Sequence, residues 1–136
     1  MIREIVHDPV FLAQPSVPAT AADLPVAQDL IDTLTANLDR CVGMAANMIG
    51  ERKRIIVMAR GPLVTAMLNP KILSASGEYE TEEGCLSLQG TRKTKRYRII
   101  RLSWQDMRMK EHTDTLDGFP AQIVQHEIDH CDGVLI

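Results

Sequence analysis

The sequence predicts one compact domain that combines helices with strands, and three observations support this prediction. The chain has 136 residues, of which 45% are hydrophobic and 24% are charged, a composition typical of a single folded domain. Two segments have the apolar spacing of amphipathic helices, one near residue 30 and one close to the end of the chain. Between them lie short apolar runs rich in β-branched residues, which are typical of strands. We therefore expect one domain over residues 1–136.

The composition argues against two classes of partner. The net charge is -3 and only 4% of the residues are aromatic, so neither a phosphate-neutralising surface nor a base-stacking platform is expected. No apolar run approaches the roughly 20 residues needed to span a bilayer, and the first residues lack the apolar stretch of a secretory signal. We expect a cytoplasmic protein without nucleic-acid or membrane partners. Three cysteines are too few, and odd in number, for a disulfide framework.

The first half of the chain predicts a loop, a helix and two strands. Four prolines within residues 1–25 exclude a long helix or a central strand there. Residues 26–39 predict an amphipathic helix, because apolar residues recur at every fourth position: Val26, Leu30, Leu34 and Leu38. The runs at 54–58 and 65–68 predict strands, and we expect the second to end at Asn69-Pro70. Small residues from Gly43 onward allow a close backbone approach.

The second half predicts a charged hairpin. Acidic residues gather over 78–83 and basic residues over 92–101, so paired strands would set opposite charges against each other. Charge runs usually face water, which favours solvated strand faces over a nucleic-acid patch.

The last third predicts a strand, a turn region and a helix. Ile100, Leu102 and Trp104 alternate with polar residues, which is typical of a half-buried strand. Residues 106–118 are polar, and we expect turns there. A helix should then begin at Pro120 and end at Gly133. The residues expected on its core side are Ile123, Val124 and Ile128.

This helix carries the pattern His126-Glu127-Ile128-Asp129-His130. Four residues advance a helix by slightly more than one turn, so His126 and His130 lie about 40° apart on one face and can share a metal ion. Glu127 then lies beside the open side of that ion, where a carboxylate can take a proton from water. A chain of this composition would contain the pattern by chance in fewer than about one case in a hundred. The competing interpretation is two ordinary surface histidines.

A catalytic site of this kind needs a third protein ligand. Few residues follow His130, so we expect that ligand upstream or directly adjacent. The candidates are His7, His112, Cys41, Cys85 and Cys131. Cys85 stands out because Gly84 allows a close backbone approach and because it ends an acidic strand. A lone cysteine is nevertheless more often a small buried residue, so the residues alone do not identify the third metal ligand.

Three segments resemble the signature motifs of the peptide deformylases. Segment 41–50, Cys-Val-Gly-Met-Ala-Ala-Asn-Met-Ile-Gly, is similar to the first motif. Segment 83–87, Glu-Gly-Cys-Leu-Ser, and segment 125–130, Gln-His-Glu-Ile-Asp-His, are similar to the second and third. The resemblance implies an α+β fold in which antiparallel strands pack around a central metal-bearing helix. It also implies Cys85 as the third ligand.

The same resemblance implies a reaction. Peptide deformylases are metal-dependent hydrolases that remove the N-formyl group from the N-terminal methionine of nascent peptides and release formate. Here Cys85, His126 and His130 would hold one divalent ion, Fe²⁺ in the native protein, with Zn²⁺ and Ni²⁺ fitting the same ligands. Glu127 would take a proton from water and return it to the departing amine. The implied partners are N-formylmethionyl peptides, with transient proximity to the ribosome.

The resemblance further implies supporting and substrate-binding residues. Those that would line the slot for the methionine side chain are Val42, Gly43, Leu86, Phe119 and Ile123. By spacing alone, core packing is the favoured explanation of Phe119 and Ile123. Gln122 is either polar lining or simply exposed. Glu83 and Arg96 match a family ion pair that supports the site, in agreement with the opposite charges of the hairpin.

Met48 is the main departure from the family pattern, which has Gln at this position. The family also has Gly where this chain has Cys41. The family's Gln acts with the backbone N–H of the residue after the ligand cysteine, here Leu86, as an oxyanion hole for the tetrahedral intermediate. A thioether donates no hydrogen bond. Asn47 carries an amide, but adjacent side chains point to different sides. We therefore expect weak or redirected activity.

Other functions compete with the leading hypothesis of a deformylase. Met48 favours a related hydrolase that acts on another N-acyl group. A non-catalytic protein that binds a metal or a peptide is the third possibility, although Glu127, which no metal ligation requires, argues against it. A general endoprotease is disfavoured because the chain is short for an extended cleft.

Overall fold

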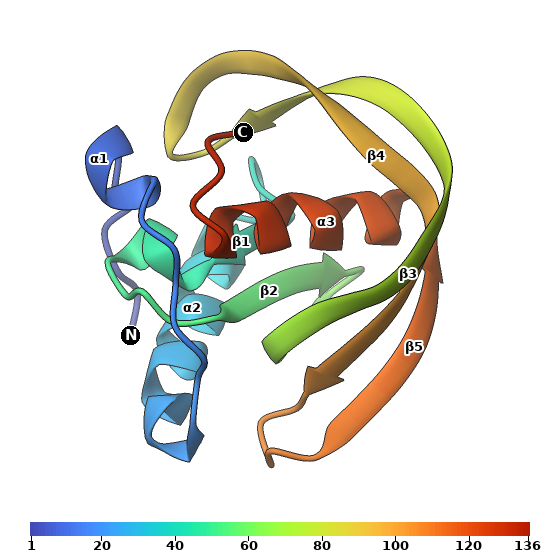
Figure 1. The fold of residues 1–136 in the computed structure, drawn as a ribbon. Helices are drawn as coiled ribbons and strands as arrows, with labels where there is room; N and C mark the ends of the chain where they lie inside the picture. Colours follow the sequence, from blue (N-terminus) through green and yellow to red (C-terminus); the bar gives the residue numbers. More distant parts are fainter.

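The computed structural model describes residues 1–136 and contains three helices, two 3₁₀ turns and one five-stranded sheet. The helical elements are α1 (Pro9–Leu12), η1 (Ala21–Asp23), α2 (Leu24–Ala36), η2 (Ala46–Ile49) and α3 (Phe119–Cys131). The strands are β1 (Gly43–Ala45), β2 (Ile55–Arg60), β3 (Leu63–Cys85), β4 (Leu88–Gln105) and β5 (Glu111–Asp117). Each strand pairs antiparallel with the next along the chain. The long strands β3 and β4 curve around α3, which crosses the middle of the molecule (Figure 1). The α+β class and the central helix are confirmed.

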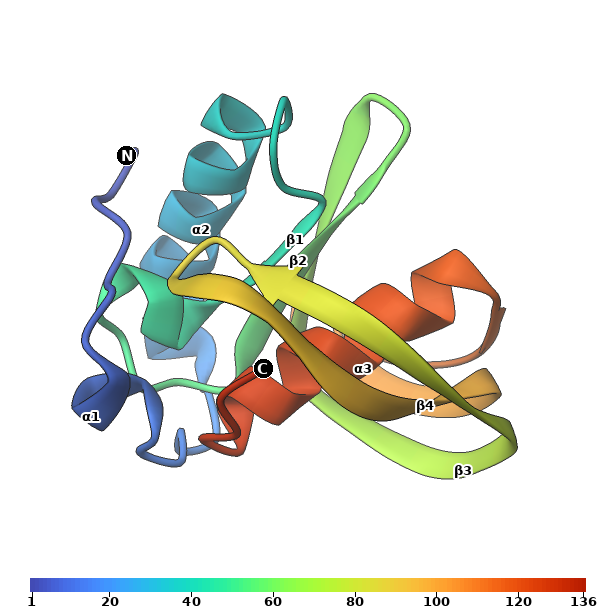
Figure 2. The same cartoon turned by 90° about the horizontal axis from the view of Figure 1, so that it is seen from above.

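Strand β2 separates two hydrophobic cores. Its side chains alternate between the two faces of the sheet, so Ile55 and Val57 pack in the core with α2, and Ile56 and Met58 pack in the core with α3. Figure 2 shows α2 and α3 on opposite sides of β1 and β2. Because both faces are covered, the strand is continuously apolar.

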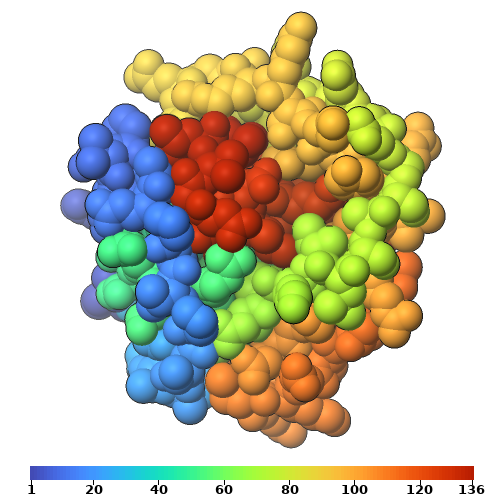
Figure 3. Space-filling view, in the orientation of Figure 1, coloured from blue at the N-terminus to red at the C-terminus, as the bar shows by residue number.

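Helix α3 follows the boundaries that the sequence predicts, to within two residues. Pro120 lies in its first turn, where a missing N–H costs nothing. Gly133 follows its end with φ 78° and donates its N–H to the carbonyl of His130. Its apolar side packs against the sheet through Ala121, Val124 and Ile128. The end of α3 and the last residues reach the surface between the N-terminal segment and the β3–β4 hairpin (Figure 3).

Strand β3 does not end at Asn69-Pro70, so that prediction was wrong. The pairing of β3 with β4 shifts register between Leu68 and Lys71, and Asn69 adopts φ 51°. This bulge absorbs the proline, which has no N–H to donate, and the strand continues beyond it. The Asn69 amide also donates to the carbonyl of Ala19 at 2.9 Å, which fixes the bulge against the N-terminal segment.

The prediction that residues 106–118 are turn-like was wrong for most of that range. Only the segment around Asp106 forms a turn, in which its carboxylate accepts the N–H groups of Arg108 and Lys110. Strand β5 follows and pairs with β4 at the edge of the sheet. Leu116 is its only buried residue, so the apolar alternation that identifies a strand is absent.

The remaining expectations for local structure hold with small changes. Residues 1–23 contain only short helical turns, as the prolines of this segment predict, and Pro25 lies in the first turn of α2. Helix α2 begins two residues before the expected position and ends at Ala36, where the Asn37 side chain donates to the carbonyl of Thr33. In the hairpin, Glu80 stands opposite Lys95 and Glu82 opposite Lys93, as the charge pattern predicts. Neither α2 nor α3 has the length and apolar character that a membrane crossing requires.

Candidate metal centre and active site

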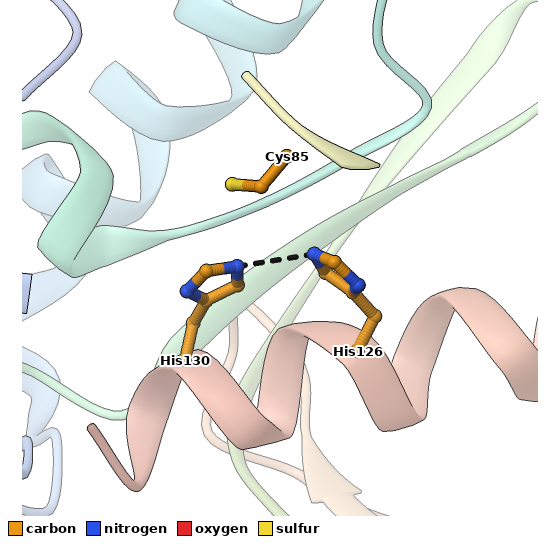
Figure 4. A group of neighbouring side chains, drawn as sticks. All are labelled: Cys85, His126 and His130. Atoms are coloured by element: carbon orange, nitrogen blue, oxygen red, sulfur yellow. Dashed lines mark hydrogen bonds between the residues drawn. The ribbon is translucent and has the colours of Figure 1, made fainter. Parts of the chain in front are cut away.

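Cys85, His126 and His130 meet at the centre of the fold. Cys85 ends β3, and the two histidines lie on α3, 41 and 45 residues further along the chain. One ligand atom from each residue lies within 4.8 Å of the other two, and the Nε2 atoms of the histidines are 3.0 Å apart. Both rings project from α3 toward the side where Cys85 lies (Figure 4). His126 is 8% exposed and His130 is 0% exposed, so water is largely excluded from the group.

The turn that follows β3 holds Cys85 in place. The backbone N–H of Ser87 donates to the Cys85 sulfur at 3.4 Å. Ser87 is itself bound through its carbonyl to Nδ1 of His7 at 3.0 Å, so the N-terminal segment anchors this turn.

The other candidate ligands lie elsewhere. His7 is hydrogen-bonded to the carbonyl of Ser87. His112 lies on β5, where it stacks on Trp104 and is hydrogen-bonded to Asp106 at 2.7 Å. Cys131 is 0% exposed in the core between α3 and the sheet. Cys41 lines the cavity beside the site, and its thiol donates to the Gly43 carbonyl.

Glu83 orients His126. Its Oε1 lies 2.8 Å from Nδ1 of His126, which leaves Nε2 of that ring to face His130. Arg96 binds the same carboxylate through Nη2 at 2.7 Å and Nε at 3.0 Å, and Gln122 donates to its Oε2 at 2.8 Å. Burial alone would raise the pKa of Glu83, but these donors lower it to about 2. A charged carboxylate thus fixes the ring.

The hydrogen-bond network extends to two residues that the sequence analysis did not assign. Arg96 binds Asp129 through Nη1 at 2.7 Å, and Gln122 binds Glu83. Asp129 lies within the histidine pattern, three residues after His126, so it shares a helix side with that residue. This spacing was a usable signal for Asp129. For Gln122 the pattern left polar lining and exposure equally open.

The pair of histidines favours one positive charge at the site. Burial would lower the pKa of His126, but the Cys85 sulfur and the Glu83 carboxylate raise it to about 10. For His130, burial and the neighbouring charge of His126 lower the pKa to about 3. The positive charge therefore lies on His126, and His130 is neutral. A thiol and two imidazoles are also a donor set that suits Fe²⁺, Zn²⁺ and Ni²⁺, so these residues fit a divalent ion.

Replacing Arg96 with Ala is expected to lower the free energy of unfolding by about 3–5 kcal/mol, because the Glu83 carboxylate would stay buried without its ion-pair partner. Arg96 and Glu83 side chains are only 4% and 7% exposed. Metal affinity should also fall by about 10- to 100-fold as His126 loses its fixed orientation. Denaturant unfolding and competition with a chelator measure the two effects. Arg98→Ala, at an exposed position of the same strand, is the control; equal losses in both variants would contradict this role.

Glu127 lies beside the two histidines without a fixed partner. The residue is 4% exposed, and its Oε1 atom has no hydrogen-bond partner. Burial, reinforced by the Glu83 charge, raises the pKa of Glu127 to about 7, although His126 opposes the shift. A carboxylate with such a pKa can both accept and release a proton near neutral pH.

Gly43 brings strand β1 close to Glu127. A Cβ atom at this position would lie 2.7 Å from Cγ2 of Ile123 and 2.9 Å from Oε2 of Glu127. Only glycine therefore allows this approach of backbone and helix. The small residues of segment 43–46 predict such an approach, and the structure confirms it.

Gly43→Ala is expected to lower the free energy of unfolding by about 1–3 kcal/mol, because the added methyl group overpacks the contact between β1 and α3. It should also reduce activity by displacing the Glu127 carboxylate. Unfolding by denaturant and steady-state kinetics measure both. Gly84→Ala places a Cβ at an ordinary distance of 3.5 Å from its nearest neighbour and should be far less destabilising; a stable, fully active Gly43→Ala protein would contradict the assignment.

A cavity of about 590 Å³ opens beside Cys85 and His126. It is lined by all the residues assigned to the methionine slot: Val42, Gly43, Leu86, Phe119 and Ile123. Val42 is 41% exposed and Phe119 is 59% exposed, so both lie at the rim and core packing does not explain Phe119. Ile123 is 8% exposed and belongs both to the wall of the cavity and to the core.

Met48 also lines this cavity, on η2. It is 1% exposed, and its sulfur accepts the N–H of Ala45 at 3.5 Å. The neighbouring Asn47 does not line the cavity, because its amide donates to the carbonyl of His130 at 2.9 Å. Asn47 therefore ties η2 to α3 and does not replace the missing donor.

Comparisons with known proteins agree on one family. A family model described as polypeptide deformylase matches residues 2–136. The chain is 53% identical over 136 residues to a peptide deformylase of Clostridium beijerinckii, with both chains fully covered. It is 38% identical over 142 residues to a peptide deformylase of Dictyoglomus thermophilum, with 100% of this chain and 91% of that one covered.

Solved structures give the same result. The peptide deformylase of Thermotoga maritima has a TM-score of 0.88 at 30% identity, covering 99% of this chain and 95% of that one. A class I type b peptide deformylase of Acinetobacter baumannii, bound to Met-Ala-Ser, has a TM-score of 0.88 at 27% identity, covering 99% of this chain and 97% of that one.

Proposed function

The chain belongs to the peptide deformylase family, and we propose that the site formed by Cys85, His126, His130 and Glu127 removes the N-formyl group from the N-terminal methionine of nascent peptides. The observation that carries this proposal is the position of Glu127, a buried carboxylate with a free oxygen beside three convergent metal-binding side chains. The products are formate and a peptide with a free amine.

The family is metal-dependent, and we assign the metal to Cys85, His126 and His130. A divalent ion held by these residues would supply Lewis-acid chemistry, which polarises the formyl group and makes water more acidic. We propose Fe²⁺ as the native ion, with Zn²⁺ and Ni²⁺ as substitutes for the same ligands. Glu83 and Arg96 keep Nε2 of His126 directed toward this position.

Glu127 moves the proton in the reaction. It takes a proton from the water molecule whose oxygen attacks the formyl carbon, and it returns a proton to the nitrogen as the C–N bond breaks. The backbone N–H of Leu86 stabilises the negative oxygen of the tetrahedral intermediate. Met48 supplies no second donor, so this stabilisation is incomplete.

The cavity accepts the methionine side chain of the substrate. Ile123 and Leu86 supply apolar walls, and Val42 and Phe119 form the rim where the peptide enters. The Acinetobacter baumannii relative binds Met-Ala-Ser, which supports a peptide that begins with methionine as the ligand. Because formylmethionine begins nascent chains, we also propose transient proximity to the ribosome in the cytoplasm.

Met48 favours one alternative, a related hydrolase with weak formyl activity and another N-acyl substrate. A non-catalytic binding protein is disfavoured by Glu127, which no metal ligation requires.

The proposal is tested by metal content and formate release, measured without oxygen because thiolates are vulnerable to oxidation. We expect about one divalent ion per chain and formate from formyl-Met-Ala-Ser. Acetyl-Met-Ala-Ser serves as the parallel substrate. Faster release of acetate than of formate would favour the alternative hydrolase, and a metal-loaded protein that cleaves neither peptide would contradict the proposed function.

A further inference from the structure

We propose that Gln122 makes the cavity selective for the thioether of methionine over a hydrocarbon side chain of the same shape. The inference rests on the proposed function, because it takes the first side chain of a formylated peptide as the occupant of the cavity. Gln122 is therefore a specificity-determining residue in the wall of this cavity.

The position of Gln122 on α3 places its amide in the cavity. It lies one helical turn before His126 and follows Phe119 by three residues, and all three line the same cavity. Gln122 is half-buried, whereas the helix residues that follow it, from Ile123 to Ile128, are buried. Together with His126 and Glu127, its side chain is thus one of the polar groups of α3 that line the cavity.

Glu83 fixes the orientation of this amide. The Glu83 carboxylate is paired with Arg96, whose Nη2 and Nε donate to it, and it faces Nδ1 of His126, so its oxygens act as hydrogen-bond acceptors. The group of Gln122 that lies 2.8 Å from Oε2 of Glu83 must therefore be the NH₂ group. One of its two N–H bonds is used on Glu83. No other side-chain partner of Gln122 is present in the structure, so the second N–H is available to a ligand.

A second N–H in the wall of the cavity discriminates between two similar side chains. The thioether sulfur of methionine is a weak acceptor, and the corresponding methylene of norleucine is not. When norleucine fills the cavity, it displaces water from the N–H and leaves this donor without an acceptor. The unpaired donor weakens the binding of norleucine relative to methionine. Since the side chain does not react, the difference should appear in KM rather than in kcat.

The test compares formyl-Met-Ala-Ser with formyl-norleucyl-Ala-Ser as substrates of the metal-loaded protein. We expect kcat/KM to be about fivefold to tenfold higher for the methionine peptide, a difference that corresponds to one weak hydrogen bond. Gln122→Met replaces the amide with an unbranched side chain of similar length, and it should bring the ratio close to one. Any general loss of rate through Glu83 affects both peptides equally and cancels in the ratio. Gln28→Met, at an exposed position of α2, is the matched control and should keep the ratio of the unaltered protein.

Binding of the products provides a readout that does not depend on turnover. Titration calorimetry with Met-Ala-Ser and norleucyl-Ala-Ser should give the same ratio of dissociation constants, and Gln122→Leu should abolish it as Gln122→Met does. If the unaltered protein processes and binds both peptides equally, or if the ratio persists in both Gln122 variants, the role of Gln122 is contradicted while the proposed function stands. If neither formylated peptide is cleaved, the proposed function fails, and this inference fails with it.

Discussion

Glu127→Gln is expected to lower kcat for formate release by about 10²–10⁴-fold, the contribution that a positioned general acid–base group makes. The amide has the same shape but cannot accept the proton of the attacking water. Glu127 is not among the three metal-binding side chains, so the metal content of the variant should equal that of the unaltered protein. Formate release and metal analysis on the same sample measure both quantities.

The control for this variant is Glu111→Gln, which removes an exposed carboxylate from β5. Its rate and metal content should not change. If Glu127→Gln keeps its rate, another group moves the proton. If it loses the metal together with the rate, Glu127 acts through the metal centre, and the proposed division of roles is wrong.

Met48→Gln is expected to raise kcat by about 10- to 100-fold, because removal of one oxyanion donor from a protease costs about 10²–10³ in rate and the substitution supplies the donor that is missing here. Met48 lines the cavity and is 1% exposed, so an amide at this position would lie in a site that excludes water. Steady-state rates with formyl-Met-Ala-Ser measure the change.

Met48→Leu separates the hydrogen bond from the change in volume. Leucine donates nothing, so this variant should not exceed the rate of the unaltered protein. The gain in Met48→Gln should appear in kcat and leave KM nearly constant, since the donor acts on the transition state. An unchanged kcat in Met48→Gln would show that Leu86 alone supplies the stabilisation that the reaction needs.

The elements that could be predicted from the sequence are those whose pattern is local. Helix α3 has a proline at its start, a glycine after its end and an apolar side, and all three are contiguous signals. Strand β2 is covered on both faces, so its residues form one apolar run. Strand β5 has one buried residue, Leu116, and an edge strand of this kind owes its existence to pairing with β4 rather than to its own apolar pattern.

The continuation of β3 past Asn69-Pro70 could not be predicted for a related reason. An Asn-Pro pair usually ends a strand, and here a bulge compensates for it through contacts with Ala19 and Gln105, which are distant in sequence. The energy that keeps the strand intact therefore comes from tertiary contacts.

The candidate site likewise has residues that local spacing predicts and residues that only the fold brings together. His126, Glu127 and His130 follow from helical spacing alone, because one turn brings both histidines to one face. Cys85 lies 41 residues before His126, and only the folding of β3 around α3 brings the two together. From the residues alone the third ligand stayed open among five candidates, and the family resemblance selected Cys85. The hydrogen bond of Gln122 to Glu83 depends on the same long-range approach.

The measurement that tests the central claim most directly is X-ray absorption spectroscopy of the iron-loaded protein and of its Cys85→Ser variant. The account predicts one sulfur and two imidazole nitrogens bound to each metal ion. The variant should lose the sulfur signal and most of its metal. A metal ion bound without sulfur in the unaltered protein, or an unchanged spectrum in Cys85→Ser, would contradict a centre built from Cys85, His126 and His130.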